Sequence, residues 1–288
     1  VKTWAWARKS AQLQQHLGDE FDIRVVYQYE RPPDVIPSDF DLLHTYEVMQ
    51  AIHLAPTGPF TTGITAHVWP GHERNHGRDQ LVALMGRARA VHANSVLLVE
   101  ETRRRYGVTT HYCPNGVDEC FFRRLRDDRP RDRLVVGWVG KPNQRKGRHL
   151  VEASCAMADV ELRVVANTHR DALPPEEMRE FYQGLHVLCV ASDMDGTPNP
   201  ALEAAGCGVA IVSNRIGNMP EFVQYGVNGL LVGPLPDPDP VQPAAADLVV
   251  ALRELAADVL RVVRMGEAAR ATVERAWTWR DLSRHYAE

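Results

Sequence analysis

The sequence predicts an α/β protein made of two doubly wound domains in tandem. Short apolar runs rich in Val and Ile alternate with stretches that carry apolar residues at helical spacing, as expected of parallel strands joined by helices. A length of 288 residues is enough for two ordinary domains. A charged stretch at residues 123–133 interrupts the alternation, and a new series of strands and helices follows it.

In the first half, we expect a helix over residues 6–17 with Thr3 as its N-cap. The expected strands are 21–27, 40–45, 62–66, 90–93 and 111–114, and further helices are expected at 79–87 and 96–106. The last of these strands runs into a Pro-Asn-Gly turn at residues 114–116.

The stretch 123–133 alternates arginines with aspartates, which favours a solvated linker over a nucleic-acid patch. We therefore place the domain boundary there. The expected domains are residues 1–126 and 127–276, and a C-terminal helix at 277–288 is expected to pack back on the first domain. In the second half, the expected strands are 134–139, 161–166, 187–191, 210–213 and 229–232, and the expected helices are 148–158, 176–182, 200–205, 220–225, 244–255 and 259–276.

The composition excludes several classes of protein. With 44% hydrophobic and 24% charged residues, the chain is expected to fold, and a net charge of −4 argues against a nucleic-acid binder held by bulk charge. No apolar run reaches the roughly 18 residues that a membrane span needs. The five cysteines form no CxxC pair, which is typical of reduced thiols in the cytoplasm.

The loop at residues 140–147 follows an expected strand and is rich in positive charge. Only four of the 33 basic residues of the chain are lysines, and two of these four, Lys141 and Lys146, lie in this loop with Arg145. Ligands of open α/β sheets bind at the carboxyl ends of strands, and ammonium groups suit phosphate oxygens. A diphosphate site and a solvated surface loop explain the residues equally well.

A second loop leads into the helix expected at residues 200–205. Asn199 suits the N-cap and Pro200 the first helical position, so the free N–H groups and the dipole of the helix would bind an anion. Glu203, in the first turn, could then accept hydrogen bonds from a ribose attached to that anion. The alternative is that Glu203 only complements the helix dipole and that Asp195 only caps a turn.

Other polar segments carry less information. Gly217 and Pro220 explain the loop at 214–221 as a turn without any ligand. His67 follows an expected strand, and a lone histidine is more often structural than catalytic. A zinc site that adds His72 and His76 is disfavoured, because the three residues lie on a loop that offers only one further ligand. The sequence contains no GxSxG, Walker A or GxGxxG motif.

Taken in order, these segments resemble the retaining GT-B glycosyltransferases of the group 1 type, the large family 4 of sugar-nucleotide-dependent transferases. The matching segments are PNGVD at 114–118, GK and KG at 140–141 and 146–147, the acidic pair Asp195 and Glu203 with seven residues between them, VSN at 212–214, GNMPE at 217–221 and GVNGLLV at 226–232. The resemblance implies two Rossmann-like domains that face a central cleft, with acceptor side 1–126 and nucleotide-sugar side 127–276.

The resemblance also implies a role for each matching residue. Lys141 and Lys146 would bind the donor diphosphate, and Lys146 would offset charge on the leaving nucleotide. Glu203 would hold the ribose and Asp195 the transferred sugar, while His67 would lie near the reacting centre. The remaining donor contacts would come from the segment after Gly196, namely Thr197, Pro198, Asn199 and Ala201.

The activity implied is transfer of a hexose-type sugar from a nucleoside diphosphate to the hydroxyl of a sugar, lipid-linked or small-molecule acceptor, with retention and without a cofactor or metal. Peripheral contact with the inner membrane face is a further expectation, although a solvated helix face explains the arginines at 103–105 better. The sequence departs from the family pattern at two places. Asp195 replaces the usual Glu, and Trp4-Ala5-Trp6-Ala7 stands where the family has its first strand and glycine-rich loop. The alternatives are an inert nucleotide-sugar binder and a sugar-nucleotide epimerase or hydrolase on the same fold.

Overall fold

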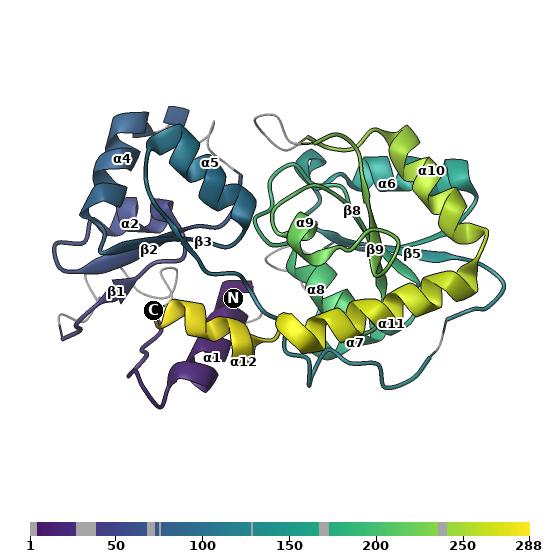
Figure 1. Ribbon diagram of the computed structural model, residues 1–288, viewed down its shortest axis with the longest axis horizontal. Helices are drawn as coiled ribbons and strands as arrows, with labels where there is room; N and C mark the ends of the chain where they lie inside the picture. The colour runs from purple at the N-terminus through teal and green to yellow at the C-terminus, as the bar shows by residue number, and fades with distance from the viewer. Residues whose placement is uncertain are drawn as a thin grey trace.

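The computed structural model describes residues 5–26, 39–67, 73–74, 76–127, 129–166, 173–235 and 241–288. The described chain forms two parallel sheets, each with its own helices, that lie side by side (Figure 1). We call residues 43–112 the N-terminal lobe and residues 135–276 the C-terminal lobe. The expected cap Thr3, the strand end Tyr27 and the histidine His72 lie outside the described residues.

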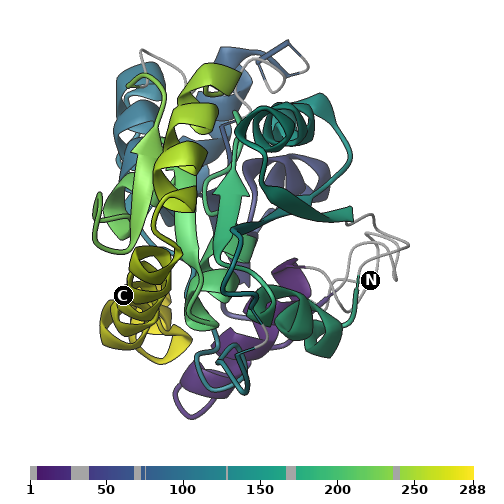
Figure 2. The ribbon, with the colours of Figure 1, turned by 90° about the vertical axis from the view of Figure 1, so that its right-hand side faces the viewer.

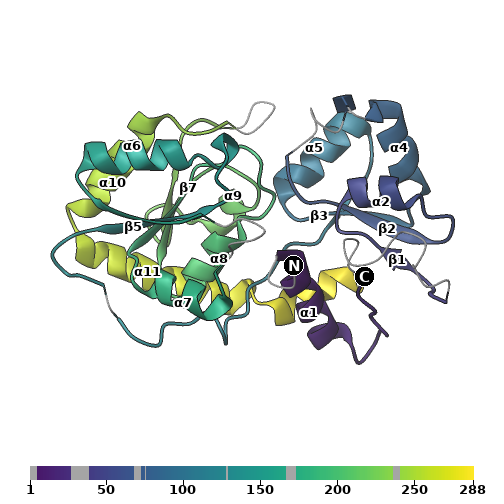
Figure 3. The ribbon, with the colours of Figure 1, turned by 180° about the vertical axis from the view of Figure 1, so that it is seen from behind.

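The N-terminal sheet has the strand order β1-β2-β3-β4, and all of its pairs are parallel. The strands are β1 Leu43–His44, β2 Phe60–Ile64, β3 Ala90–Ala93 and β4 His111–Tyr112, and the helices are α2 Val48–Leu54, α4 Arg78–Arg87 and α5 Val96–Tyr106. These helices cover one face of the sheet in Figures 1 and 3. Their apolar side chains form one cluster with the strands, which includes Phe60, Ile64 and Leu81.

The C-terminal sheet has the order β6-β5-β7-β8-β9, again all parallel. The strands are β5 Val135–Gly140, β6 Glu161–Ala166, β7 Val187–Val190, β8 Ala210–Asn214 and β9 Gly229–Val232, and the helices are α6 Arg148–Ala158, α7 Pro175–Gln183, α8 Asn199–Gly206, α9 Met219–Phe222, α10 Ala245–Ala256 and α11 Val259–Ala276. One apolar cluster packs the sheet against α6 and α10, and a second packs it against α7, α8 and α11. Figure 2 shows this layering end-on, with yellow-green α10 above the strands and yellow α11 below them.

Segments from near the two ends of the chain pack against each other beside the N-terminal sheet. Helix α1, Ala5–Leu17, contacts the short helix α12, Trp279–Leu282, and the 3₁₀ turn Ser283–Tyr286 that follows it (Figures 1 and 3). The hydroxyl of Tyr286 donates to the carbonyl of Cys113 at 2.7 Å. The last residues therefore form a short helix and a 3₁₀ turn rather than the single helix expected at 277–288. The boundary at residue 126 stays a prediction.

The expected strand at 21–27 is wrong over its described part, because residues 21–26 are irregular. The side chains of Phe21 and Val26 are 46% and 45% exposed, so the alternating pattern is not buried on a sheet. The carbonyl of Ile23 instead accepts from the side chain of Gln14 at 2.8 Å. The expected strand at 111–114 ends at Tyr112, since Pro114 has no N–H for a ladder.

Two helices also differ from expectation. Helix α2 was not expected, although Glu47 and Gln50 form a capping box at its start. The helix expected at 220–225 ends at Phe222, because the backbone N–H of Gln224 donates to the side chain of Asn228 and a turn follows. No helix in the described ranges is both long and apolar enough to cross a bilayer.

Candidate functional site

The lysine-rich loop is fixed by its own turn and by the neighbouring strand. Residues Gln144–Lys146 form a 3₁₀ turn, in which the side chain of Asn143 accepts from the N–H of Lys146. Gly147 has φ +67, and a Cβ there would lie 2.1 Å from the carbonyl oxygen of Ala191. Only glycine lets the loop approach the end of β7 this closely, so the approach places Lys146 beside the segment that carries Asp195.

Lys146 and Asp195 form a direct ion pair, Nζ to Oδ1, with side chains that are 19% and 18% exposed. Burial, followed by repulsion from Lys146, lowers the pKa of Lys141, while Asp195 acts in the opposite direction. The structure therefore brings together the two lysines and the carboxylate that the sequence singled out. The alternative in which Asp195 only caps a turn does not account for this pair between its carboxylate and Lys146.

Arg145 links the same loop to the other lobe. Its guanidinium pairs with Asp193 at 2.9 Å and reaches the carbonyl oxygen of His67 at 3.5 Å. The backbone N–H of Asp193 donates to the carbonyl of Arg145 at 3.1 Å. The lysine loop and the loop after β7 are thus tied to each other beside His67 of the N-terminal lobe.

Helix α8 begins one residue earlier than expected, with Pro198 as its N-cap and Asn199 inside the helix. The amides of Asn199 and Ala201 donate to the carbonyls of Thr197 and Pro198, and prolines have no N–H. The expectation that the first amides of this helix are free is therefore wrong in part. An anion bound here would be held mainly by the side chains of Lys141 and Lys146. The hydroxyl of Thr197 donates to the carbonyl of Asn94 at 3.3 Å, across the two lobes.

Glu203 lies beyond the first turn of α8, not within it, and its side chain is 9% exposed. One carboxylate oxygen pairs with Arg8 of α1 at 2.9 Å, and the other accepts from the hydroxyl of Tyr182 at 2.9 Å. Burial raises the pKa of Glu203, against the opposing effects of Arg8 and Tyr182. Glu203 is therefore a buried, paired carboxylate, and it does not serve merely as a complement to the helix dipole.

A cavity of about 240 Å³ adjoins Glu203 between α1 and the C-terminal lobe. Its lining includes Arg8, Asn115 and Asn199, with the aromatic rings of Phe121 and Phe122. Asn115 donates to the side chain of Asn199 at 3.2 Å. The two lysines are not among the described residues that line this cavity, so the expected site divides into a cavity at Glu203 and a charged cluster at Lys146.

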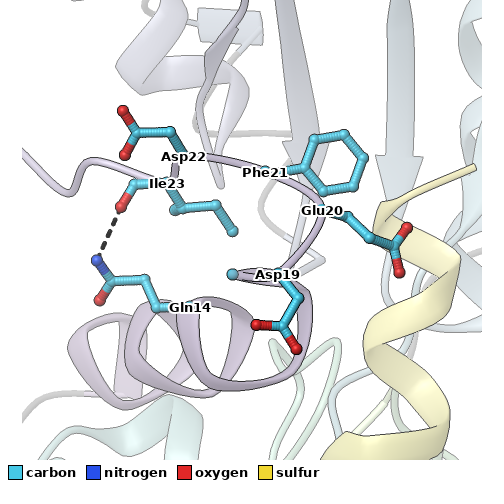
Figure 4. Close-up of a pocket in the computed structure, with 7 residues that line it drawn as sticks. Gln14, Asp19, Glu20, Phe21, Asp22 and Ile23 are labelled. Carbon is cyan, nitrogen blue, oxygen red and sulfur yellow. Dashed lines mark hydrogen bonds between the residues drawn. The ribbon is translucent and has the colours of Figure 1, made fainter.

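A second hollow, of about 430 Å³, lies in the turn that follows α1 (Figure 4). Its lining is Gln14, Gly18, Asp19, Glu20, Phe21, Asp22 and Ile23. Figure 4 shows the carboxylates of Asp19, Glu20 and Asp22 turned away from one another. This hollow contains none of the residues that the sequence singled out.

His67 is 5% exposed and follows β2 by three residues. Its Nδ1 lies 2.6 Å from Oε2 of Glu101 on α5, and its Nε2 is buried with no hydrogen-bond partner among the described residues. Sequence reasoning missed Glu101, because it assigned the Glu and Arg residues of the helix at 96–106 to a polar face, and spacing gives no partner 34 residues away.

The loop at 214–221 behaves as the expected turn and also packs against the loop after β7. Gly217 has φ +52, and a Cβ there would lie 2.1 Å from the carbonyl oxygen of Gly196. Glu221 then crosses to the N-terminal lobe, where it accepts from the N–H of Val96 at 2.7 Å and from the hydroxyl of Tyr112. Burial raises the pKa of Glu221, which Tyr112 and Val96 oppose. No sequence pattern indicates this contact, since the partners of Glu221 lie more than 100 residues away.

Residues 119–258 match the family model for "Glycosyl transferases group 1". Over these residues the chain is similar to the group 1 glycosyltransferases. A D-inositol 3-phosphate glycosyltransferase from Streptomyces bingchenggensis is 29% identical over 154 residues, which cover 52% of this chain and 31% of that relative. The chain therefore spans less than a third of the length of this curated relative.

Solved structures give the fold. Sucrose-phosphate synthase from Thermosynechococcus elongatus superposes with a TM-score of 0.71 at 17% identity, covering 86% of this chain and 72% of that one. Anabaena HepE in complex with UDP-glucose superposes with a TM-score of 0.69 at 16% identity, covering 86% and 77%. The two-lobed arrangement of this chain is the GT-B fold, as the sequence predicted.

Proposed function

We propose that the chain transfers a sugar from a nucleoside-diphosphate donor to an acceptor hydroxyl, with retention of the anomeric configuration and without a metal. The observation that carries this proposal is the cluster of Lys141, Lys146 and Asp195 at the carboxyl ends of β5 and β7, within a glycosyltransferase domain. Parallel sheets bind their ligands at these strand ends.

The lysines are suited to the diphosphate. In the absence of donor, Lys146 is neutralised by Asp195, and a diphosphate would supply the negative charge in its place. Burial, followed by repulsion from Lys146, lowers the pKa of Lys141, and the repulsion would ease once phosphate oxygens lie between the two ammonium groups. Two cations at the leaving group supply the charge stabilisation that glycosyl transfer needs as the bond to the anomeric carbon breaks.

The carboxylates are suited to the rest of the donor. Glu203 borders the cavity next to α8. Its carboxylate would accept hydrogen bonds from ribose hydroxyls, either in place of its pair with Arg8 or together with it. Asp195, released from Lys146, would accept from a hydroxyl of the transferred sugar. Because the leaving phosphate can take the proton of the acceptor hydroxyl on the same face, retention requires no second carboxylate as a base.

The proposal is tested by incubating the full chain with UDP-glucose, GDP-mannose and related donors, together with sugar, lipid-linked and small-molecule acceptors. Nucleotide release and the anomeric configuration of the product, read by proton NMR, are the measurements. We expect an axial donor linkage to give an axial product linkage. A product of inverted configuration would overturn the mechanism, and donor binding without transfer or hydrolysis would identify an inert nucleotide-sugar binder.

Variants test the assignment of the lysines. Lys146→Ala is expected to lower turnover about 100-fold, corresponding to about 3 kcal/mol of lost leaving-group stabilisation. Arg148→Ala is the matched control, because Arg148 lies two residues away but pairs with Glu152 on the exposed side of α6. Near-normal turnover in Lys146→Ala would show that the diphosphate assignment is wrong.

A further inference from the structure

The pair formed by His67 and Glu101 is a buried contact between a histidine ring and a carboxylate. Both side chains are 4% exposed, and Nδ1 of His67 lies 2.6 Å from Oε2 of Glu101. Glu101 lies in the second turn of α5, whose N-terminus is fixed by the side chain of Ser95. The histidine comes from a loop and the carboxylate from a regular helix, so the helix sets the position of the ring.

Glu101 is held on both of its oxygens. The guanidinium of Arg105, one helical turn further on, donates to Oε1 at 3.2 Å. A neighbouring cation favours the ionised form of a carboxylate, and an ionised carboxylate only accepts hydrogen bonds. The proton of a neutral His67 ring is therefore on Nδ1, and Nε2 carries a lone pair.

Nε2 of His67 is buried and has no partner among the residues that the structure describes. A buried acceptor without a partner costs stability unless a ligand supplies the donor. The donor-side loops border this histidine from two directions. Arg145 reaches its carbonyl oxygen, and a Cβ on Gly196, next to Asp195, would lie 2.3 Å from the carbonyl oxygen of Thr65.

We propose that Glu101 is a positioning residue, which holds His67 in the tautomer with the proton on Nδ1 and leaves Nε2 to accept a hydrogen bond from a hydroxyl of the bound sugar. This inference rests on the proposed function for its ligand, a sugar attached to a nucleoside diphosphate. The geometry parallels that of other enzymes in which a carboxylate fixes the tautomer and orientation of a working histidine.

The tautomer is measured directly by ¹⁵N NMR on histidine-labelled protein. The signals of His67 are assigned by their loss in His67→Gln. In the wild type, we expect a protonated Nδ1 and an unprotonated Nε2 at a pH where the ring is neutral. In Glu101→Leu, we expect mixed tautomers, and in Glu101→Gln, whose side-chain carbonyl still accepts from Nδ1, we expect the wild-type tautomer. A wild-type spectrum with the proton on Nε2 would overturn the proposal.

Kinetics then separate positioning from a purely structural role. Glu101→Leu is expected to lower kcat roughly tenfold or more while the KM for donor changes less than twofold, and Glu101→Gln is expected to restore much of the loss. Glu100→Gln, an exposed neighbour on α5, is the matched control and is expected to keep wild-type kinetics. Unchanged kcat in Glu101→Leu would contradict the proposal.

The two readouts distinguish this inference from the proposed function. If no donor is turned over by the wild type, the proposed function fails, but the NMR measurement still decides the tautomer of His67. If donors are turned over and the tautomer is the opposite one, only the role of Glu101 fails. If circular dichroism shows that Glu101→Leu does not fold, the ¹⁵N NMR spectra of the wild type and of Glu101→Gln still determine the tautomer of His67.

Discussion

The two lobes share one kind of sheet but bury different kinds of side chain. The C-terminal sheet lies between two apolar clusters, and its central strands β7 and β8 are buried along their whole length. The N-terminal lobe has one apolar cluster among the described residues. Beside it, the lobe buries ionisable groups on its strands, loops and helices, including Glu47, His67, His92 and Glu101.

We infer from this difference that the two lobes have different roles. Apolar packing on both faces makes the C-terminal lobe a rigid support for the lysine loop and for α8. Buried ionisable groups cost stability unless each one is paired, so the N-terminal lobe depends on specific hydrogen bonds and on contacts with its neighbours. Buried ionisable groups of this kind can bind a ligand or take part in a reaction, but they add little to the stability of the lobe.

The largest expected effect comes from the apolar core of the C-terminal lobe. Leu202 on α8 is 1% exposed, and Leu202→Ala should lower the free energy of unfolding by about 3 kcal/mol, because it leaves a cavity in a dense cluster. Leu260→Ala on α11 is the control, since Leu260 is 66% exposed. Chemical denaturation measures both, and a loss below about 1 kcal/mol in Leu202→Ala would contradict the rigid support.

The next effect is a pH dependence that belongs to the N-terminal side. Lys9 of α1 is 3% exposed, with its ammonium 4.6 Å from the ring centres of Tyr46 and Tyr286. Burial lowers the pKa of Lys9 from 10.5 to about 7, although Cys113 and Glu47 oppose this shift. Between these values the unfolded chain binds a proton that the folded chain does not, so stability rises with pH.

We therefore expect Lys9→Met to remove a slope of about 1 kcal/mol per pH unit between pH 7 and about 8.5, below the range where thiols titrate. Urea denaturation at several pH values measures the free energy of unfolding of both proteins. The slope should be present in the wild type and absent in Lys9→Met. Parallel lines for the two proteins would show that Lys9 does not titrate in this window.

The smallest effect concerns the contact between the lobes. Tyr112→Phe removes one donor to the carboxylate of Glu221 and leaves the N–H of Val96, so we expect a loss of about 1 kcal/mol. A double-mutant cycle with Glu221→Gln should give a coupling energy of similar size. Additive losses, with no coupling, would mean that the two side chains do not interact in solution.

The sequence predicted the C-terminal lobe more accurately than the N-terminal lobe, for a physical reason. Strand β9 and helices such as α6 and α11 fell at their predicted bounds, because a buried strand is a continuous apolar run and a covering helix shows one clear apolar stripe. The irregular residues 21–26 show the opposite case, where an alternating pattern occurs without burial.

For the site, the sequence could identify the residues that share a short loop but not the partners that supply the geometry. Lys141, Lys146 and Asp195 come together as the loop positions indicated. Glu101 and Glu221 could not be found, because each acts on a partner that is distant in the chain and near only in the fold. The pairing of Arg8 with Glu203 was equally invisible from spacing.

The most direct test of the account is the affinity of the chain for nucleoside diphosphates, measured by titration calorimetry with UDP and GDP. We expect wild type and Arg148→Ala to bind one of them with equal affinity, and Lys146→Ala to bind it at least tenfold more weakly, the loss of about 1.4 kcal/mol or more that removal of a charged contact brings. Equal affinity in Lys146→Ala, or binding of neither nucleotide by the wild type, would contradict the placement of the diphosphate between the lysine loop and α8.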